Sequence, residues 1–125
     1  SASPPPSQRP PTFPGESGQP TDGPRFPEEI AMACAGQPGG EEIVETLRAS
    51  NLLPAGVEAE VVDGPYCSGT WQYAMVSVPD RDPLQVITEG KPGALTLVTV
   101  GTDVCTVEVR MLAPAGIRAV AACLG

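Results

Sequence analysis

The chain has 125 residues, with fifteen aspartate and glutamate side chains, seven lysine and arginine side chains, no histidine and a formal net charge of −8. This length fits one domain at most. The negative charge repels phosphate backbones and anionic headgroups, which argues against binding to nucleic acid or directly to a membrane. No apolar run approaches the roughly 18 residues of a membrane-spanning helix.

The first 27 residues differ sharply in composition from the rest. They hold nine of the sixteen prolines and no valine, isoleucine, leucine or methionine. Such a segment cannot bury enough apolar surface to offset its ordering entropy. We therefore predict a disordered or polyproline II tether over residues 1–27 and one small domain over residues 28–125. The two acids and two bases of the tether cancel, so the net negative charge belongs to the domain.

Two helices are expected at the start of the domain. Residues 28–35 have room for two helical turns before the break at residues 38–40. Residues 41–53 form the stronger candidate, because acids at the N-terminal end favour the helix dipole and Ile43 and Leu47 lie on one face. Pro54 then ends the helix.

Alternating apolar and polar residues predict strands in the middle of the chain. The expected strands cover residues 57–61, 66–78, 84–89 and 95–100. A polar loop over residues 79–83 separates the second from the third. Pro92 followed by Gly93 indicates a type II turn before the fourth.

The last segment contains two further expected elements. Residues 107–111 alternate apolar and polar side chains, which favours a short strand or an extended run. Pro114 suits the first turn of a closing helix that reaches Cys123, with Ile117, Val120 and Ala121 facing inward. The predicted fold class is α+β, with an N-terminal helix packed on a curved antiparallel sheet of about four strands and a short C-terminal helix.

The cysteines are Cys34, Cys67, Cys105 and Cys123. They form no Cys-x-x-Cys pair, and no histidine could complete a zinc site. An even number of well-separated cysteines in a small domain favours disulfides and an oxidising compartment. Of the three possible connectivities we favour Cys34 with Cys67 and Cys105 with Cys123. The chain is thus expected to be extracytoplasmic, either secreted or held at the outer face of the membrane by an anchor that lies outside this sequence.

The aromatic residues of the domain gather in eight residues, at Tyr66, Trp71 and Tyr73. On a strand, Trp71 and Tyr73 share one face, which could be an exposed binding stripe. Alternatively, Trp71 is a core anchor packed against the disulfide of Cys67, the usual role of a lone tryptophan in a small disulfide domain. Both alternatives stay open at this stage.

No set of residues indicates catalysis. There is no histidine to activate a serine, and the only lysine, Lys91, lies in an expected turn. Asp80 and Asp82, with Asp63 or Asp103, could supply oxygens to calcium, but two acids around an arginine fit a solvated turn better. We predict that the chain is not an enzyme and holds no metal or cofactor.

Three segments together resemble a known kind of domain. They are Cys67-Ser68-Gly69-Thr70-Trp71, Gly101-Thr102-Asp103-Val104-Cys105, and Pro114-Ala115-Gly116-Ile117 running to Cys123. In this order they resemble small exported domains of actinobacterial envelope proteins, including mycobacterial and streptomycete lipoproteins and anchored ectodomains. The resemblance implies export, disulfides and a helix-on-sheet fold, and it implies no particular activity. The head has no cysteine to carry a lipid.

Two functions follow as hypotheses. The first is a non-catalytic envelope domain that is held by the Pro-rich tether and binds a protein or cell-wall partner through its sheet or through Tyr66, Trp71 and Tyr73. The alternative is a secreted protease inhibitor that acts through the loop of residues 79–83.

Overall fold

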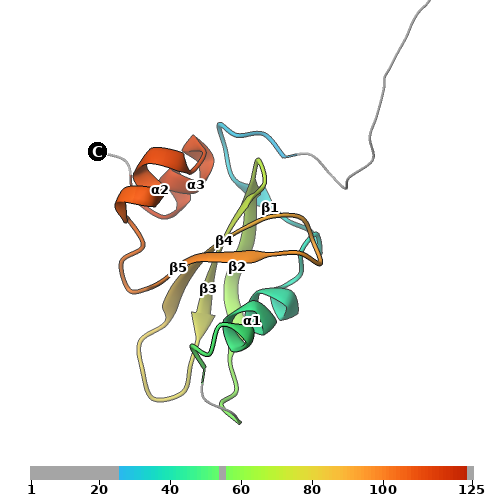
Figure 1. Ribbon diagram of the computed structural model, residues 1–125, viewed down its shortest axis with the longest axis vertical. Coiled ribbons are helices and arrows are strands. Elements are labelled where there is room, and N and C mark those ends of the chain that lie inside the picture. The colour runs from blue at the N-terminus through green and yellow to red at the C-terminus, as the bar shows by residue number, and fades with distance from the viewer. Residues whose placement is uncertain (1–25, 54–55, 124–125) are drawn as a thin grey trace, which may run out of the picture.

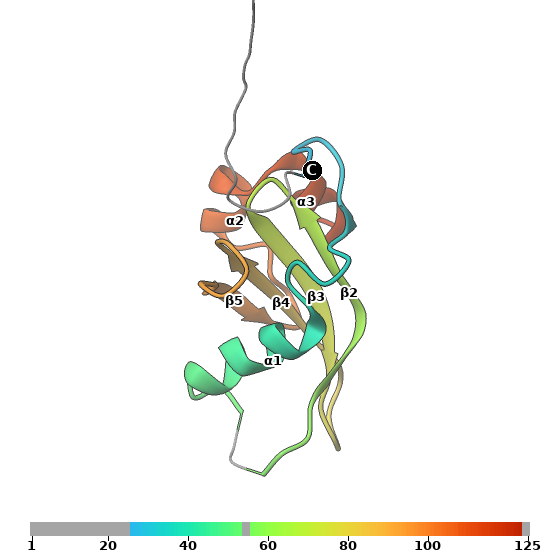
Figure 2. The ribbon, with the colours of Figure 1, turned by 90° about the vertical axis from the view of Figure 1, so that its right-hand side faces the viewer.

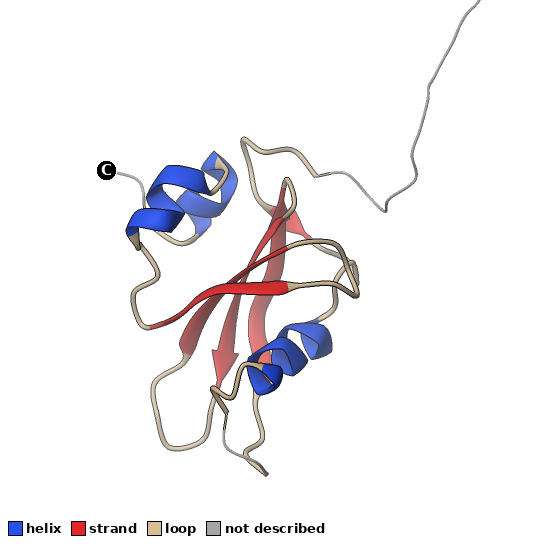
Figure 3. Ribbon diagram, viewed as in Figure 1, coloured by secondary structure: helices blue, strands red, loops and turns tan. Residues whose placement is uncertain are grey.

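A five-stranded antiparallel sheet forms the centre of the domain, with helices on both of its sides (Figures 1 and 3). The computed structural model describes residues 26–53 and 56–123. The strand order follows the sequence, from β1 to β5. The elements in chain order are β1 (Met32–Ala33), α1 (Gly40–Ala49), β2 (Glu60–Ser68), β3 (Trp71–Ser77), β4 (Leu84–Glu89), β5 (Thr96–Gly101), α2 (Val107–Leu112) and α3 (Ala115–Val120). The α+β class and the antiparallel sheet are as predicted. The count of four strands is wrong, and so is the prediction that the domain begins with a helix, because β1 precedes α1.

Helices cover both faces of the sheet. Tyr73 is paired with Ile87 across β3 and β4, and the next pair is Ala74 with Val86. Because successive strand residues point to opposite faces, these pairs lie in different cores. The α1-side core contains Ile43, Leu47, Leu53, Ala74, Val76, Val78 and Val86. The α3-side core contains Tyr73, Ile87, Val104, Val109, Ala113, Ile117, Ala121 and Cys123.

Helix α1 is shorter than the predicted helix over residues 41–53. Its apolar stripe is as expected, since Ile43 and Leu47 are both buried. The helix ends early because Asn51 takes a left-handed φ of 62°, and the Leu52 N–H bonds back to the Leu47 carbonyl. This is a common way for a helix to end. The turn brings Leu53 into the α1-side core.

The helix predicted over residues 28–35 is wrong. The first described element is β1, which pairs with β2. Residues far away in the sequence donate hydrogen bonds to backbone carbonyls at the start of this segment. The Ser68 hydroxyl donates to the carbonyls of Pro27 and Glu28 at 2.9 and 3.0 Å, and the Gly116 N–H donates to Glu28 at 2.8 Å. The predicted tether over residues 1–27 otherwise lies outside the described residues; only Phe26 and Pro27 of that range are described.

The single strand predicted over residues 66–78 is in fact a hairpin. Strand β2 continues to Ser68, and β3 starts at Trp71. Gly69 lies between them with a φ of 58°, a conformation that glycine adopts without strain. An added β-carbon at Gly69 would lie 3.1 Å from the Glu28 side chain. The run of residues 66–78 thus contains a tight turn, which places Trp71 opposite Ser68.

The strand predicted over residues 107–111 is also wrong, because these residues form α2. The Thr106 side chain caps this helix by accepting a hydrogen bond from the Val109 N–H at 3.2 Å. Val109 is fully buried, whereas Val107 and Met111 are exposed. Helix α3 then begins after Pro114, so the chain closes with two short helices instead of one.

A buried amide joins the two turns at one end of the sheet. The Gln72 side chain is 3% exposed. Its Nε2 donates to the carbonyls of Thr70 and Gly90 at 3.2 and 2.9 Å, and its Oε1 accepts the Thr88 hydroxyl at 2.7 Å. Each polar atom of the amide therefore has a partner, as burial requires.

Candidate binding surface

The three predicted aromatic residues lie together and face the α3-side core. Tyr66 is paired with Tyr73 across β2 and β3. Tyr73 is 4% exposed and belongs to the core itself, while Tyr66 and Trp71 are half-buried against it. Tyr73 therefore has almost no surface to offer a partner. A contact through Tyr66 or Trp71 stays a prediction.

Trp71 does not lie against the disulfide of Cys67. Cys67 is paired with Gln72, so its side chain lies on the opposite face of the sheet from Trp71. Trp71 instead packs against the core that α2 and α3 cover. Trp71 thus helps to hold the C-terminal helices on the sheet.

Both tyrosine hydroxyls are already engaged within the domain. The Tyr66 hydroxyl donates to the Asp63 carboxylate at 2.5 Å, and the Tyr73 hydroxyl donates to the Gln85 side chain at 2.8 Å. The hydrogen bond to Asp63, followed by the charge of the same carboxylate, raises the pKa of Tyr66. Burial is the main cause that raises the pKa of Tyr73. Both phenols are therefore stabilised in the neutral form, which suits anchoring and not nucleophilic chemistry.

Two disulfides crosslink the domain. Cys34 bonds to Cys67, with a Cα–Cα distance of 5.1 Å, and so joins the end of β1 to β2. Cys105 bonds to Cys123 at a Cα–Cα distance of 5.3 Å, and so closes the segment that contains α2 and α3. This is the predicted connectivity. Two disulfides indicate an oxidising, extracytoplasmic environment.

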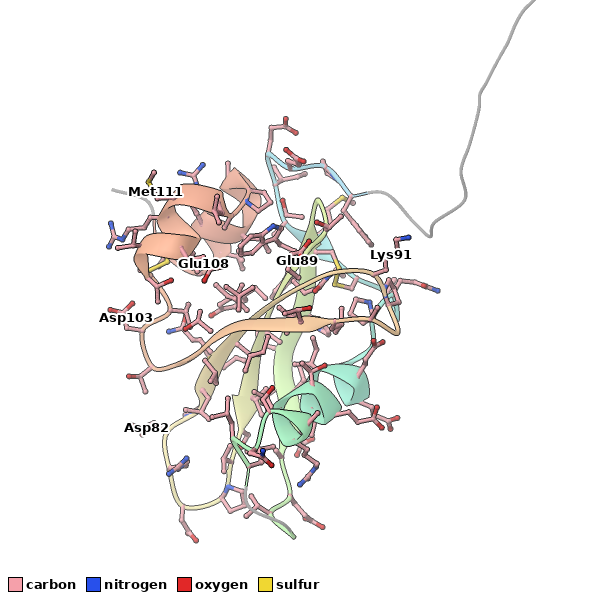
Figure 4. All side chains as sticks on the ribbon, viewed as in Figure 1. Asp82, Glu89, Lys91, Asp103, Glu108 and Met111 are labelled. Carbon is pink, nitrogen blue, oxygen red and sulfur yellow. A yellow bond between two sulfur atoms is a disulfide. The ribbon has the colours of Figure 1, made fainter. Side chains whose placement is uncertain are left out.

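The outer face of α2 is a surface that the sequence did not reveal. We define the α2 face as Val107, Met111 and Leu112, which are 76%, 76% and 64% exposed. Figure 4 shows Met111 pointing away from the sheet. Val107 and Met111 are four residues apart, so they adjoin on a helix. The helical spacing of these apolar residues was the available signal, but their alternation also matched a strand.

The loop of residues 79–83 lies at the other end of the molecule. All five residues are exposed, and Figure 4 shows Asp82 far from α2. Asp80 takes a left-handed φ of 65°. No cysteine lies within the loop or beside it. The inhibitor hypothesis therefore stays a prediction. The loop that it concerns is exposed, and no disulfide in or beside the loop holds it.

The acidic residues form no metal centre in the described part of the chain. Among residues 26–53 and 56–123, no group of three or more histidine, cysteine, aspartate or glutamate side chains is arranged to hold a metal ion. Within the same ranges, no helix is long and apolar enough to cross a membrane. Comparison of the chain with protein-family models, curated proteins and solved structures finds no match.

Proposed function

We propose that this chain is a non-catalytic binding domain of a cell envelope, held by its Pro-rich head and binding a protein partner through the α2 face. One observation carries the proposal. Three large apolar side chains on a six-residue helix are 64–76% exposed. Exposed apolar groups that adjoin one another are typical of protein-binding sites.

The α2 face is held in one conformation before any partner arrives. Thr106 caps the helix, and Val109 anchors it in the α3-side core. The disulfide from Cys105 to Cys123 encloses α2 and α3 on both sides. A surface that is already ordered loses little entropy on binding.

The free energy that burial of the α2 face could contribute is large enough for a specific contact. Burying one valine, leucine or methionine side chain contributes roughly 1.5–3 kcal/mol. The three side chains together could thus contribute several kilocalories per mole, before the costs of association are subtracted. Because the face is apolar, it favours a protein partner over a cell-wall glycan. The disulfides and the resemblance to actinobacterial envelope domains support a location outside the cytoplasm.

The test compares capture by two variants of the full chain. We expect Val107→Ser with Met111→Ser to lower capture of a specific envelope protein at least about tenfold, since a tenfold loss needs only about 1.4 kcal/mol. Leu52→Ser is the matched control, because Leu52 is an exposed apolar residue outside the α2 face, at 44% exposure. Quantitative mass spectrometry of proteins retained from envelope extract gives the measurement. Equal retention by the double variant and the wild type, with both folded by circular dichroism, would rule out the α2 face.

A further inference from the structure

A groove runs between α1 and the start of β5, on the opposite side of the sheet from α2 and α3. Its volume is about 840 Å³. Thr46, Ala49 and Ser50 line one wall, and Leu95, Thr96 and Leu97 line the other. Figure 2 shows α1 below the strands, and α1 contacts β2 and β3 as well as β5. The C-terminal part of the α1 wall thus carries small side chains, while glutamates line its N-terminal part.

One wall of the groove is an unpaired strand edge. β5 is the last strand of the sheet, and no described strand pairs with its outer side. Outer strands usually carry lysine or proline, which discourages further pairing. The sequence of β5, Thr-Leu-Val-Thr-Val-Gly, has neither and carries no charge. The register of β5 against β4 shifts near Val98, and Leu95, Thr96 and Leu97 lie before this shift, beside the groove.

The charge of the groove selects its occupant. Glu41, Glu42 and Glu45 line it, and no lysine or arginine does. Glu42 accepts a hydrogen bond from the Gly93 N–H, so this carboxylate ties α1 to the turn before β5. Glu41 and Glu45 remain exposed at the groove. Exposed ion pairs contribute at most about 1 kcal/mol each, so the acids act on selectivity and on the association rate more than on affinity.

We propose that the groove between α1 and β5 binds a positively charged, extended segment of a partner protein as an additional strand. Main-chain hydrogen bonds to β5 would supply affinity, and every second side chain would point into the groove. Lysine or arginine at those positions would face Glu41 and Glu45. This site is separate from the α2 face and does not depend on it.

Two other occupants suit the groove poorly. The first 27 residues of the chain hold nine prolines, which lack the N–H that strand pairing needs, and their charges cancel. A second copy of the chain would bring its own net charge of −8 against the glutamates. A cationic, extended segment can both pair with the edge of β5 and be attracted by the glutamates of the groove.

The probe is a capped hexapeptide of alternating lysine and valine, added to the isotope-labelled full chain. We expect saturable amide shifts in residues 46–50 and 95–97, weakening as salt is added. A glutamate–valine hexapeptide and a lysine–valine peptide methylated at every backbone nitrogen are the controls for charge and for strand pairing. Neither should bind. Absence of saturable shifts at millimolar lysine–valine peptide, or equal binding by either control peptide, overturns the proposal.

Variants of the chain separate the groove from general negative charge. Glu41→Gln with Glu45→Gln should weaken binding about threefold to tenfold. Glu58→Gln with Glu60→Gln, two exposed acids outside the groove, should not.

Ala49→Trp fills the groove and should abolish peptide binding. Ala119→Trp, on the exposed side of α3, is its matched control. Thermal melting checks that each variant is folded. Unchanged peptide binding by a folded Ala49→Trp variant would also overturn the proposal. The variants of the α2 face should bind the peptide normally, so failure of one site does not imply failure of the other.

Discussion

Removal of the disulfide between Cys105 and Cys123 tests how the C-terminal helices are held. The perturbation is Cys105→Ala with Cys123→Ala, which leaves no unpaired thiol and keeps the other disulfide intact. The crosslinked residues are 18 apart in sequence. The chain-entropy model gives a loss of about 3 kcal/mol for a loop of this length. For a separation of 33, as between Cys34 and Cys67, the same model gives about 4 kcal/mol.

The expected loss is a large share of the total stability. Small domains unfold with about 5–15 kcal/mol, and a loss of 1 kcal/mol lowers the melting temperature by about 4–8 °C. We therefore expect the double variant to melt about 12–24 °C lower than the wild type. Urea unfolding should also show a steeper dependence on denaturant, because the unfolded chain expands further. A loss below about 1 kcal/mol, with no change in that slope, would refute this account of how α2 and α3 are fastened.

Three further changes test local interactions. Gln72→Leu removes the partner that Gln72 gives to the Gly90 carbonyl and the Thr88 hydroxyl, and we expect urea unfolding to show a loss of about 3 kcal/mol. Thr106→Ala removes the cap of α2 and should lower stability by about 1 kcal/mol in the same assay. Asp63→Asn should lower the pKa of Tyr66 toward 10, measured by phenolate absorbance in a Tyr73→Phe background, and an unchanged pKa would disprove the role of the carboxylate. Because the folded pKa is raised, the stabilisation from this hydrogen bond is present below about pH 10 and is lost as the pH rises through the folded value.

Elements with a local cause could be predicted from the sequence. Residues 84–89 alternate, and β4 covers the same residues. Pro92 and Gly93 predict a type II turn. Gly93 has a φ of 88°, and the Ala94 N–H bonds to the Lys91 carbonyl at 2.9 Å. In each case a few neighbouring residues decide the structure.

Elements that depend on distant contacts could not be predicted. The segment 28–35 has a helical composition, but the Glu28 carbonyl accepts hydrogen bonds from Ser68 and Gly116, some 40 and 88 residues away. Residues 107–111 show a strand pattern, yet they form a helix that is capped by Thr106 and packs through Val109 on the α3-side core. The α2 face followed from that change, because a helix turns Val107 and Met111 outward. The open edge of β5 likewise depends on sheet order, which no local pattern encodes.

Two glycines hold the first described residues against the rest of the domain. Gly69 donates its N–H to the carbonyls of Phe26 and Pro27, and Gly116 donates to Glu28. A β-carbon at Gly116 would lie 2.4 Å from the backbone of Ile30, so only glycine lets the chain pass so closely. Ser68, Gly69 and Gly116 thus together bind the backbone of residues 26–28.

Helices on both faces of the sheet limit where this domain can recognise a partner. Most of the sheet's apolar surface is used in the two cores. Recognition is left to the outside of a helix and to the edge of the sheet. The α2 face lies on the outside of a helix and is apolar. The groove beside β5 lies at the edge of the sheet and is acidic. Because α2 and α1 cover opposite faces, the two surfaces could be occupied at the same time. Their chemistry differs, so they should select different segments: an apolar one at α2 and a cationic, extended one at β5.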